Sequence, residues 1–126
     1  MRVPLRILGP CFVALSLTGC DGGATVRPYS VDVSGNPQRG KQLIQDYGCG
    51  SCHTIPGVRQ ANGLVGPPLL YFGRRSIVAG QLPNTQENLV LWIQHPREVE
   101  PKTAMPDLGL TEDQAYDISA YLYTLR

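Results

Sequence analysis

The sequence has no excess of charge of either sign and few charged residues of any kind. Eleven Lys and Arg residues against ten Asp and Glu residues leave a formal net charge of +1, and charged residues make up 17% of the 126 positions. Electrostatic binding to nucleic acid or to bulk anionic lipid needs a large field of one sign. The composition therefore excludes nucleic acid as a partner, and its 42% of hydrophobic residues suits a soluble globular domain.

The hydrophobic run near the N-terminus is too short to span a bilayer. It covers Ile7 to Leu17 and follows a positive region with Arg2 and Arg6, whereas a membrane helix needs about 18 apolar residues. A positive region followed by a short apolar run is typical of a secretory signal. The run ends in Leu17-Thr18-Gly19-Cys20, which resembles the bacterial lipobox, where the cysteine is lipidated and becomes the first residue of the mature chain.

We therefore expect three parts in the chain. Residues 1–19 are predicted to be a lipoprotein signal peptide, residues 20–35 a lipidated flexible tether, and residues 36–126 the folded domain. Lipid chains at Cys20 would anchor an exported domain to a membrane, in the periplasm or on the outer surface of a bacterium. The alternative is an ordinary secretory leader that is cleaved nearby, with Cys20 incidental.

Few cysteines and histidines remain for the folded domain. They are Cys49, Cys52, His53 and His95, so the domain lacks the residues for a disulfide framework, and a four-ligand zinc site would need a second cysteine pair. Two roles then remain for the C-x-x-C-H motif at 49–53: a redox disulfide or the attachment of haem. A thioredoxin-like pair follows a strand and opens a helix, whereas here the sequence predicts a helix that ends just before the motif.

The first and last helices of the domain have clear sequence signals. Residues 37–47 are predicted to be the first helix. Asn36 is a suitable cap, Pro37 takes the first helical position, and Gly48 follows the end of the helix. At the C-terminal end, Thr111 is predicted to cap the last helix, with Gln114 completing a capping box. No stretch of the domain alternates over a strand's length, so the sequence predicts an all-α fold.

The middle of the domain is predicted as short helices between long loops. Asn84 and Glu87 have the spacing of a capping box, and Pro96 would end the helix that they open. Pro68 could open a short helical segment that Gly73 stops. Residues 96–110 contain prolines and glycine and are predicted to be a loop.

Haem attachment accounts for the C-x-x-C-H motif at this place in the chain. Cys49 and Cys52 can each form a thioether with one vinyl group of a haem, and His53 then lies under the ring and ligates the iron. The sequence therefore predicts one covalent haem c. Attachment of this kind takes place outside the cytoplasm, which agrees with an export signal.

Met105 is the predicted second axial ligand of the iron. It is the only methionine after the predicted signal, and it lies in a Pro-x-x-x-Met-Pro loop rather than in an apolar helical stripe. Filling a core is the usual role of methionine, but this loop context favours ligation. The competing ligand is His95, whose other role would be that of a helix-end residue.

The chain resembles the class I monohaem c-type cytochromes, and most closely the cytochrome domains attached to subunit II of haem–copper oxidases. The resemblance covers residues 36–126. It rests on these motifs: GCGSCHTI at 48–55, GPPL at 66–69, FGRR at 72–75, ENLVLWIQHP at 87–96 and PKTAMP at 101–106. It implies a class I cytochrome c fold, with short helices and long loops wrapped around one covalent haem.

The resemblance also implies which residues surround the haem: Pro67, Arg74, Trp92 and Thr103. The Pro67 carbonyl would accept a hydrogen bond from Nδ1–H of His53, which orients the imidazole and raises its basicity. Arg74 would lie near a propionate, although it could also be a solvated member of an Arg-Arg pair. Thr103 would bond a propionate or nearby backbone, and Trp92 would pack beside the methionine ligand.

An iron with histidine and methionine on its two axial sides has no vacancy for a small-molecule substrate. The predicted function is therefore one-electron transfer between Fe(II) and Fe(III), not enzyme catalysis. The expected partners are redox proteins, chiefly a terminal haem–copper oxidase, with a quinol-oxidising complex as donor. Two alternatives stay open: a fixed electron-relay subunit of a periplasmic dehydrogenase or reductase, and a haem enzyme or gas sensor with an open iron site.

Overall fold

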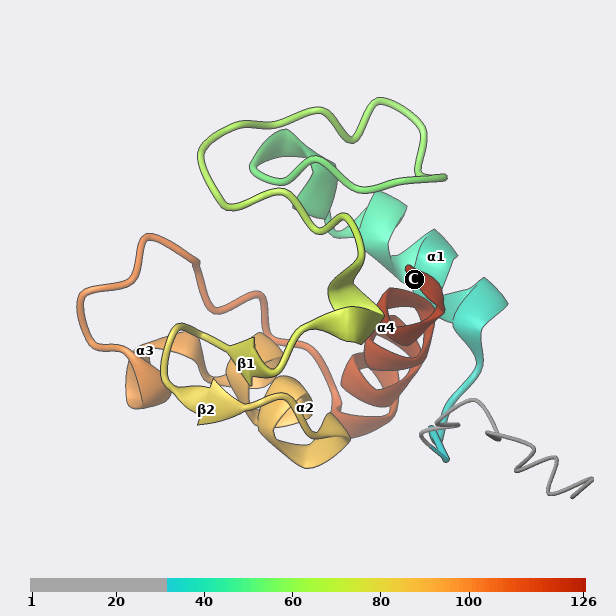
Figure 1. Ribbon diagram of the computed structural model, residues 1–126. Coiled ribbons are helices and arrows are strands. Elements are labelled where there is room, and N and C mark those ends of the chain that lie inside the picture. Colours follow the sequence, from blue (N-terminus) through green and yellow to red (C-terminus); the bar gives the residue numbers. More distant parts are fainter. Residues whose placement is uncertain (1–31) are drawn as a thin grey trace, which may run out of the picture. The chain divides into compact units, whose positions relative to one another are not determined.

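The computed structural model describes residues 32–126, and these residues form one compact unit (Figure 1). The predicted signal peptide, Cys20 and the predicted tether as far as residue 31 lie outside the described residues. Within the described part, no helix has the length and apolar character needed to cross a membrane.

Short helices and long loops dominate this unit. In chain order the elements are α1 (Pro37–Asp46), η1 (Cys49–Ser51), η2 (Phe72–Arg74), β1 (Ile77–Val78), β2 (Leu82–Pro83), α2 (Gln86–Gln94), α3 (Pro96–Val99) and α4 (Glu112–Thr124). The two short strands pair antiparallel, with Val78 opposite Leu82. The prediction of an all-α fold is confirmed, apart from this minor pair of strands.

The caps of α1 and α4 are those that the sequence predicts. The Asn36 side chain accepts hydrogen bonds from the backbone N–H groups of Gln38 and Arg39, and proline occupies the start of α1. At α4, Thr111 and Gln114 form the capping box in both directions. Each cap satisfies backbone donors that a helix start leaves unpaired, so both helix starts follow from local sequence alone.

The start of α2 differs from the prediction. Thr85, not Asn84, is its N-cap, and the Thr85 hydroxyl accepts the backbone N–H of Asn88 at 3.3 Å. The Asn84 side chain is turned elsewhere, because its amide donates to the carbonyls of Phe72 and Arg75 at 3.3 and 3.0 Å. Asn84 therefore joins α2 to the distant η2 region.

Two further predictions about the middle of the domain were wrong. The stretch 96–110 is not all loop, because Pro96 begins the four-residue helix α3. The helical turn expected over residues 68–72 lies later, at η2, and includes Gly73. Tyr71, just before η2, has the left-handed backbone angle φ 52°, which interrupts any helix that starts at Pro68.

The first and last helices cross at Gly40 of α1. A Cβ atom at this position would overlap the Asp117 carbonyl of α4 and lie 2.9 Å from the Ile118 nitrogen. The buried Asp117 carboxylate accepts the Asn36 backbone N–H at 2.7 Å and pairs with the Arg39 guanidinium. This pairing raises the pKa of Arg39. Glycine at the crossing thus allows the backbone of the two helices to touch.

The core lies between these two helices, α2 and the loops around η2. Its buried members are Ile44, Ile55, Val58, Ala61, Phe72, Val78, Leu89, Val90, Ile93, Leu110, Ala115, Ile118, Tyr121, Leu122 and Tyr123. Ahead of α1, Ser34 exchanges two hydrogen bonds with the buried side chain of Gln86, at 2.8 and 2.6 Å. The last residues of the predicted tether are therefore attached to the domain.

Candidate haem site

Cys49, Cys52 and His53 share one helical turn directly after α1. Gly48, with φ 70°, ends that helix, and the turn is closed by hydrogen bonds from the N–H groups of Cys52 and His53 to the Cys49 carbonyl, at 3.2 and 3.0 Å. Residues at i, i+3 and i+4 of a helical turn lie on one face. The turn therefore presents two thiols and an imidazole on the same face, as attachment of one haem requires.

Both cysteines of this turn are free thiols, and both are half-buried. Burial raises the pKa of the Cys49 thiol, and the neighbouring Cys52 raises it further. Thiol–disulfide exchange depends on a thiolate with a lowered pKa. The environment of Cys49 therefore disfavours the redox-disulfide alternative.

The His53 imidazole is oriented by the carbonyl of Pro67. The distance from Nδ1 of His53 to the Pro67 oxygen is 2.8 Å. A carbonyl can only accept, so Nδ1 carries the proton and Nε2 keeps its lone pair for a metal. This is the contact that the resemblance implies for these two residues.

Gly66 packs against the face of the same imidazole, a role that the sequence analysis missed. A Cβ atom at residue 66 would lie 2.7 Å from Nδ1 of His53, 2.9 Å from Nε2 and nearer still to Cε1. Only glycine at residue 66 leaves enough room for the imidazole ring in this position. The signal in the sequence was the position of Gly66 immediately before the implied acceptor Pro67.

Backbone hydrogen bonds fasten the loop of residues 63–69 along the C-x-x-C-H turn. The Gly63 N–H donates to the Gly50 carbonyl at 3.0 Å, and the Gly66 N–H donates to the Cys52 carbonyl at 2.8 Å. The Leu69 N–H donates to the Thr54 carbonyl at 2.8 Å. The Pro67 carbonyl, which accepts the hydrogen bond from the imidazole, therefore lies on a loop that is fixed to the C-x-x-C-H turn itself.

Met105 is half-buried in the loop that follows α3. Its backbone N–H donates to the Thr103 hydroxyl at 3.1 Å, and the Thr103 N–H donates to the Glu100 carbonyl at 3.0 Å. Thr103 therefore shapes the turn that carries the methionine. The side chain of His95, the competing ligand, is exposed at the junction of α2 and α3.

The two other predicted haem neighbours lie on separate elements. Trp92 is on α2, partly buried, and packs against the core. Arg74 is exposed in η2, with its guanidinium carbon 5.7 Å from the centre of the Tyr71 ring. The guanidinium of the neighbouring Arg75 instead donates a hydrogen bond to the carbonyl of Pro68.

The residues present fit a covalent haem c. Haem c needs two cysteine thiols for its thioether bonds and an imidazole with a free ring nitrogen, and a methionine sulfur is a common sixth ligand. Cys49, Cys52 and His53 meet the first two needs on a single turn, and the Gly66 backbone leaves room for the oriented ring. Among residues 32–126, no three His, Cys, Asp or Glu side chains are placed to hold a bare metal ion.

Comparison with known proteins shows to which family the domain belongs. Residues 37–126 match the Cytochrome c family, so the chain belongs to the cytochrome c family, whose members carry covalent haem c. It is similar to cytochrome c oxidase subunit 2 of Alkalihalophilus pseudofirmus, with 33% identity over 89 residues that cover 70% of this chain and 25% of that protein. The same subunit of Bacillus subtilis is 31% identical over 84 residues, which cover 62% and 24%.

The match confirms the resemblance to class I c-type cytochromes near haem–copper oxidase subunits. It also supports the general function of an electron-transfer haem protein. The chain spans about a quarter of the length of the oxidase subunits that it matches.

Proposed function

We propose that this protein is an exported one-electron carrier, tethered to the membrane by lipid at Cys20, that passes electrons to a terminal haem–copper oxidase. The observation that carries the proposal is the placement of both thiols and an oriented imidazole on one turn, at residues 49–53. The similarity to oxidase subunit 2 supports this choice of acceptor. No catalytic residue is needed for such a role.

His53 and Met105 are proposed as the axial ligands, with Cys49 and Cys52 as the points of covalent attachment. When bound, the haem supplies one-electron exchange between Fe(II) and Fe(III). The protein's part is to hold the ligands: the Pro67 carbonyl fixes the imidazole, and Thr103 fixes the backbone of Met105. A thioether sulfur stabilises the reduced metal, so Met105 would give the protein a high potential.

The lipid tether would keep the domain at the membrane surface. In the relatives, the matched region is about a quarter of subunit 2 of a cytochrome c oxidase; in this protein, lipid at Cys20 would hold the domain on the membrane that carries its partner. Confinement to a membrane surface raises the effective concentration of a partner without any new contact. Domain and partner would then meet often, even with weak affinity.

The first experiment is production of the full chain in a host that installs haem c. A red protein is expected, whose oxidised form shows the far-red sulfur-to-iron band and whose reduced form does not bind CO. Met105→Ala should remove the band and lower the potential, whereas the matched control His95→Ala should change neither. A wild-type protein that binds CO readily, or that lacks the band, would contradict the carrier mechanism and favour an open-site haem enzyme or sensor.

A second experiment tests the anchor and the partner. Cys20→Ser should release the haem protein from the membrane fraction, while the unchanged chain stays with it. Native membranes should oxidise the reduced wild-type protein with uptake of oxygen. Stable co-purification with a periplasmic dehydrogenase or reductase, without oxidation by these membranes, would favour the fixed-relay alternative instead.

A further inference from the structure

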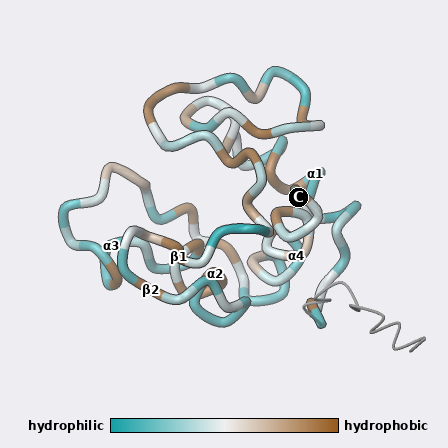
Figure 2. Tube along the Cα trace, viewed as in Figure 1, coloured by the Kyte–Doolittle hydropathy of each residue, from teal (hydrophilic) through white to brown (hydrophobic). Residues whose placement is uncertain are grey.

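The loop between α3 and α4 carries Met105, and its internal hydrogen bonds do not fix it to the rest of the domain. Figure 1 shows the loop running out from α3 and returning to α4, and Figure 2 shows hydrophobic colouring along only parts of it. The Met105 N–H donates to the Thr103 hydroxyl at 3.1 Å, and the Thr103 N–H donates to the Glu100 carbonyl at 3.0 Å. The Glu100 N–H donates in turn to the Pro96 carbonyl of α3 at 2.9 Å. These bonds shape the turn around Met105, but they join it only to α3.

Two glutamine side chains hold this segment from outside, one at each end. The amide of Gln81 donates to the carbonyl of Val99, the last residue of α3, at 2.6 Å. The amide of Gln94, the last residue of α2, donates to the carbonyl of Leu110 at 3.1 Å. In the part of the chain that the structure describes, no other hydrogen bond or ion pair joins residues 97–110 to an element other than α3. We call the two glutamines the braces of the loop.

Both braces belong to parts of the fold that are held without the loop. Gln81 follows a turn between β1 and β2 in which Ala79 and Gly80 have left-handed angles of φ 53° and 75°. The Gln81 N–H closes this turn by donating to the Val78 carbonyl at 3.2 Å, and two successive positive φ values are typical of a tight hairpin turn. Gln94 belongs to α2, which is packed into the core. The hairpin and α2 therefore fix the braces, and the loop is the part that gains order from the two bonds.

We propose that Gln81 and Gln94 are positioning residues for Met105, because their two hydrogen bonds hold the ends of its loop in place. This inference rests on the proposed role of Met105 as an iron ligand and deepens it. A segment with few hydrogen bonds to its surroundings opens locally at a lower free energy than that of unfolding the whole domain. One ordinary hydrogen bond changes such an opening equilibrium by about fivefold. The loop also gains apolar packing from Leu108 and Leu110 at its second end, so removing one brace should loosen the loop without releasing it.

The test is Gln81→Leu and, separately, Gln94→Leu in the holoprotein. Each variant loses one donor, so amide exchange at Thr103 and Met105 in the reduced protein should become about fivefold faster. The reduced variants should bind CO faster than the wild type by the same factor, and the oxidised variants should lose the far-red band at a denaturant concentration that leaves the fold intact. Gln94→Glu keeps the shape of the side chain but removes the donor at neutral pH, so it should act like Gln94→Leu.

Gln42→Leu is the matched control, because the Gln42 amide donates to Asp46 within α1 at 2.8 Å and lies outside the loop. It should leave amide exchange in the loop and CO binding as in the wild type. The proposal is overturned if both brace variants exchange as slowly as the wild type, if Gln42→Leu speeds exchange equally, or if the far-red band disappears only together with the fold. A wild-type protein without the band would instead overturn the role of Met105 as a ligand, and amide exchange would still decide whether the two glutamines hold the loop.

Discussion

The backbone of Gly66 lies against the imidazole of His53, close enough that a Cβ atom at residue 66 would come within 2.7 Å of Nδ1. The same imidazole is bonded to the Pro67 carbonyl at 2.8 Å. Adjacent residues of one loop therefore fix the ring in two ways, one by contact with its face and one by a hydrogen bond. The tight fit makes Gly66 a positioning residue for His53, the proposed iron ligand.

We predict that Gly66→Ala displaces the His53 ring while leaving the haem attached. The added methyl group must push the ring away, at a cost of about 2 kcal/mol in the free energy of unfolding, as for other overpacked sites. Visible spectroscopy should show a partly high-spin iron with easier CO binding. Gly80→Ala is the control for the spectrum: a Cβ atom there meets nothing within 4 Å, and its left-handed φ of 75° should cost only about 1 kcal/mol of stability. An unchanged spectrum in Gly66→Ala would contradict the positioning role.

A second prediction concerns the contact of α1 with α4. Gly40→Ala should lower the free energy of unfolding by about 3 kcal/mol, since the new Cβ would overlap the Asp117 carbonyl and neither helix backbone can yield cheaply. Gly48→Ala is the matched control: its Cβ would meet no atom, and the left-handed φ of 70° should cost only about 1 kcal/mol. Denaturant unfolding of the holoproteins measures both. Equal losses would mean that the crossing tolerates a side chain.

A third prediction concerns the turn that carries Met105. Thr103→Val keeps the shape of the side chain but removes the hydroxyl that accepts the Met105 N–H at 3.1 Å. The loop should then open more often, so the reduced protein should bind CO faster, and the far-red band should be lost at lower denaturant concentration. Thr85→Val, which removes the cap of α2, should lower the overall stability, so in this control the band should disappear together with the fold and not before it.

The sequence predicted those parts of the molecule that depend on near neighbours. The Asn36 cap, the Thr111 capping box and the 49–53 turn all involve residues within four positions of one another, so their patterns can be read locally. Asn84 was misread because its partners, Phe72 and Arg75, are 12 and 9 positions away and become neighbours only in the fold.

The role of Gly66 escaped the sequence analysis for the same physical reason. Its contact with His53 exists only because the 63–69 loop returns along the motif. The resemblance supplied Pro67, because the motif that carries it is shared by the family, and the structure shows the hydrogen bond directly. The role of Met105 as an iron ligand stays a prediction from its loop and from the resemblance.

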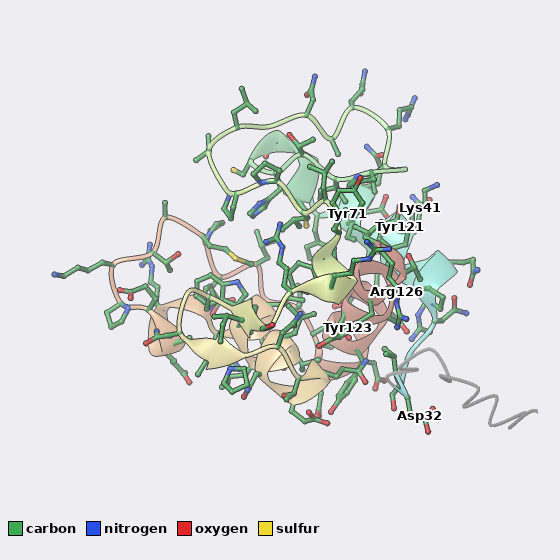
Figure 3. All side chains as sticks on the ribbon, viewed as in Figure 1. Asp32, Lys41, Tyr71, Tyr121, Tyr123 and Arg126 are labelled. Atoms are coloured by element: carbon green, nitrogen blue, oxygen red, sulfur yellow. The ribbon has the colours of Figure 1, made fainter. Side chains whose placement is uncertain are left out.

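Tyr121 makes the stability of the domain depend on alkaline pH. Its hydroxyl donates to the Pro56 carbonyl at 2.6 Å and joins α4 to the segment just after His53 (Tyr121 is labelled in Figure 3). Burial raises the pKa of Tyr121 above the ordinary tyrosine value of about 10. The folded protein therefore holds this proton to a higher pH than the unfolded chain does. The resulting stability is fully present below about pH 10 and is lost as the pH rises toward the raised value.

We predict that Tyr121→Phe lowers the free energy of unfolding by about 1 kcal/mol at pH 8, where the hydrogen bond is lost. The gap between wild type and variant should narrow as the pH rises above about 10, because only the wild type must give up the buried proton. Denaturant unfolding of both holoproteins across this range measures the gap, with Tyr71→Phe as the control at an exposed tyrosine. A gap that stayed constant or widened with pH would show that burial does not hold the proton on Tyr121, and that the contact with Pro56 stabilises the fold without any link to ionisation.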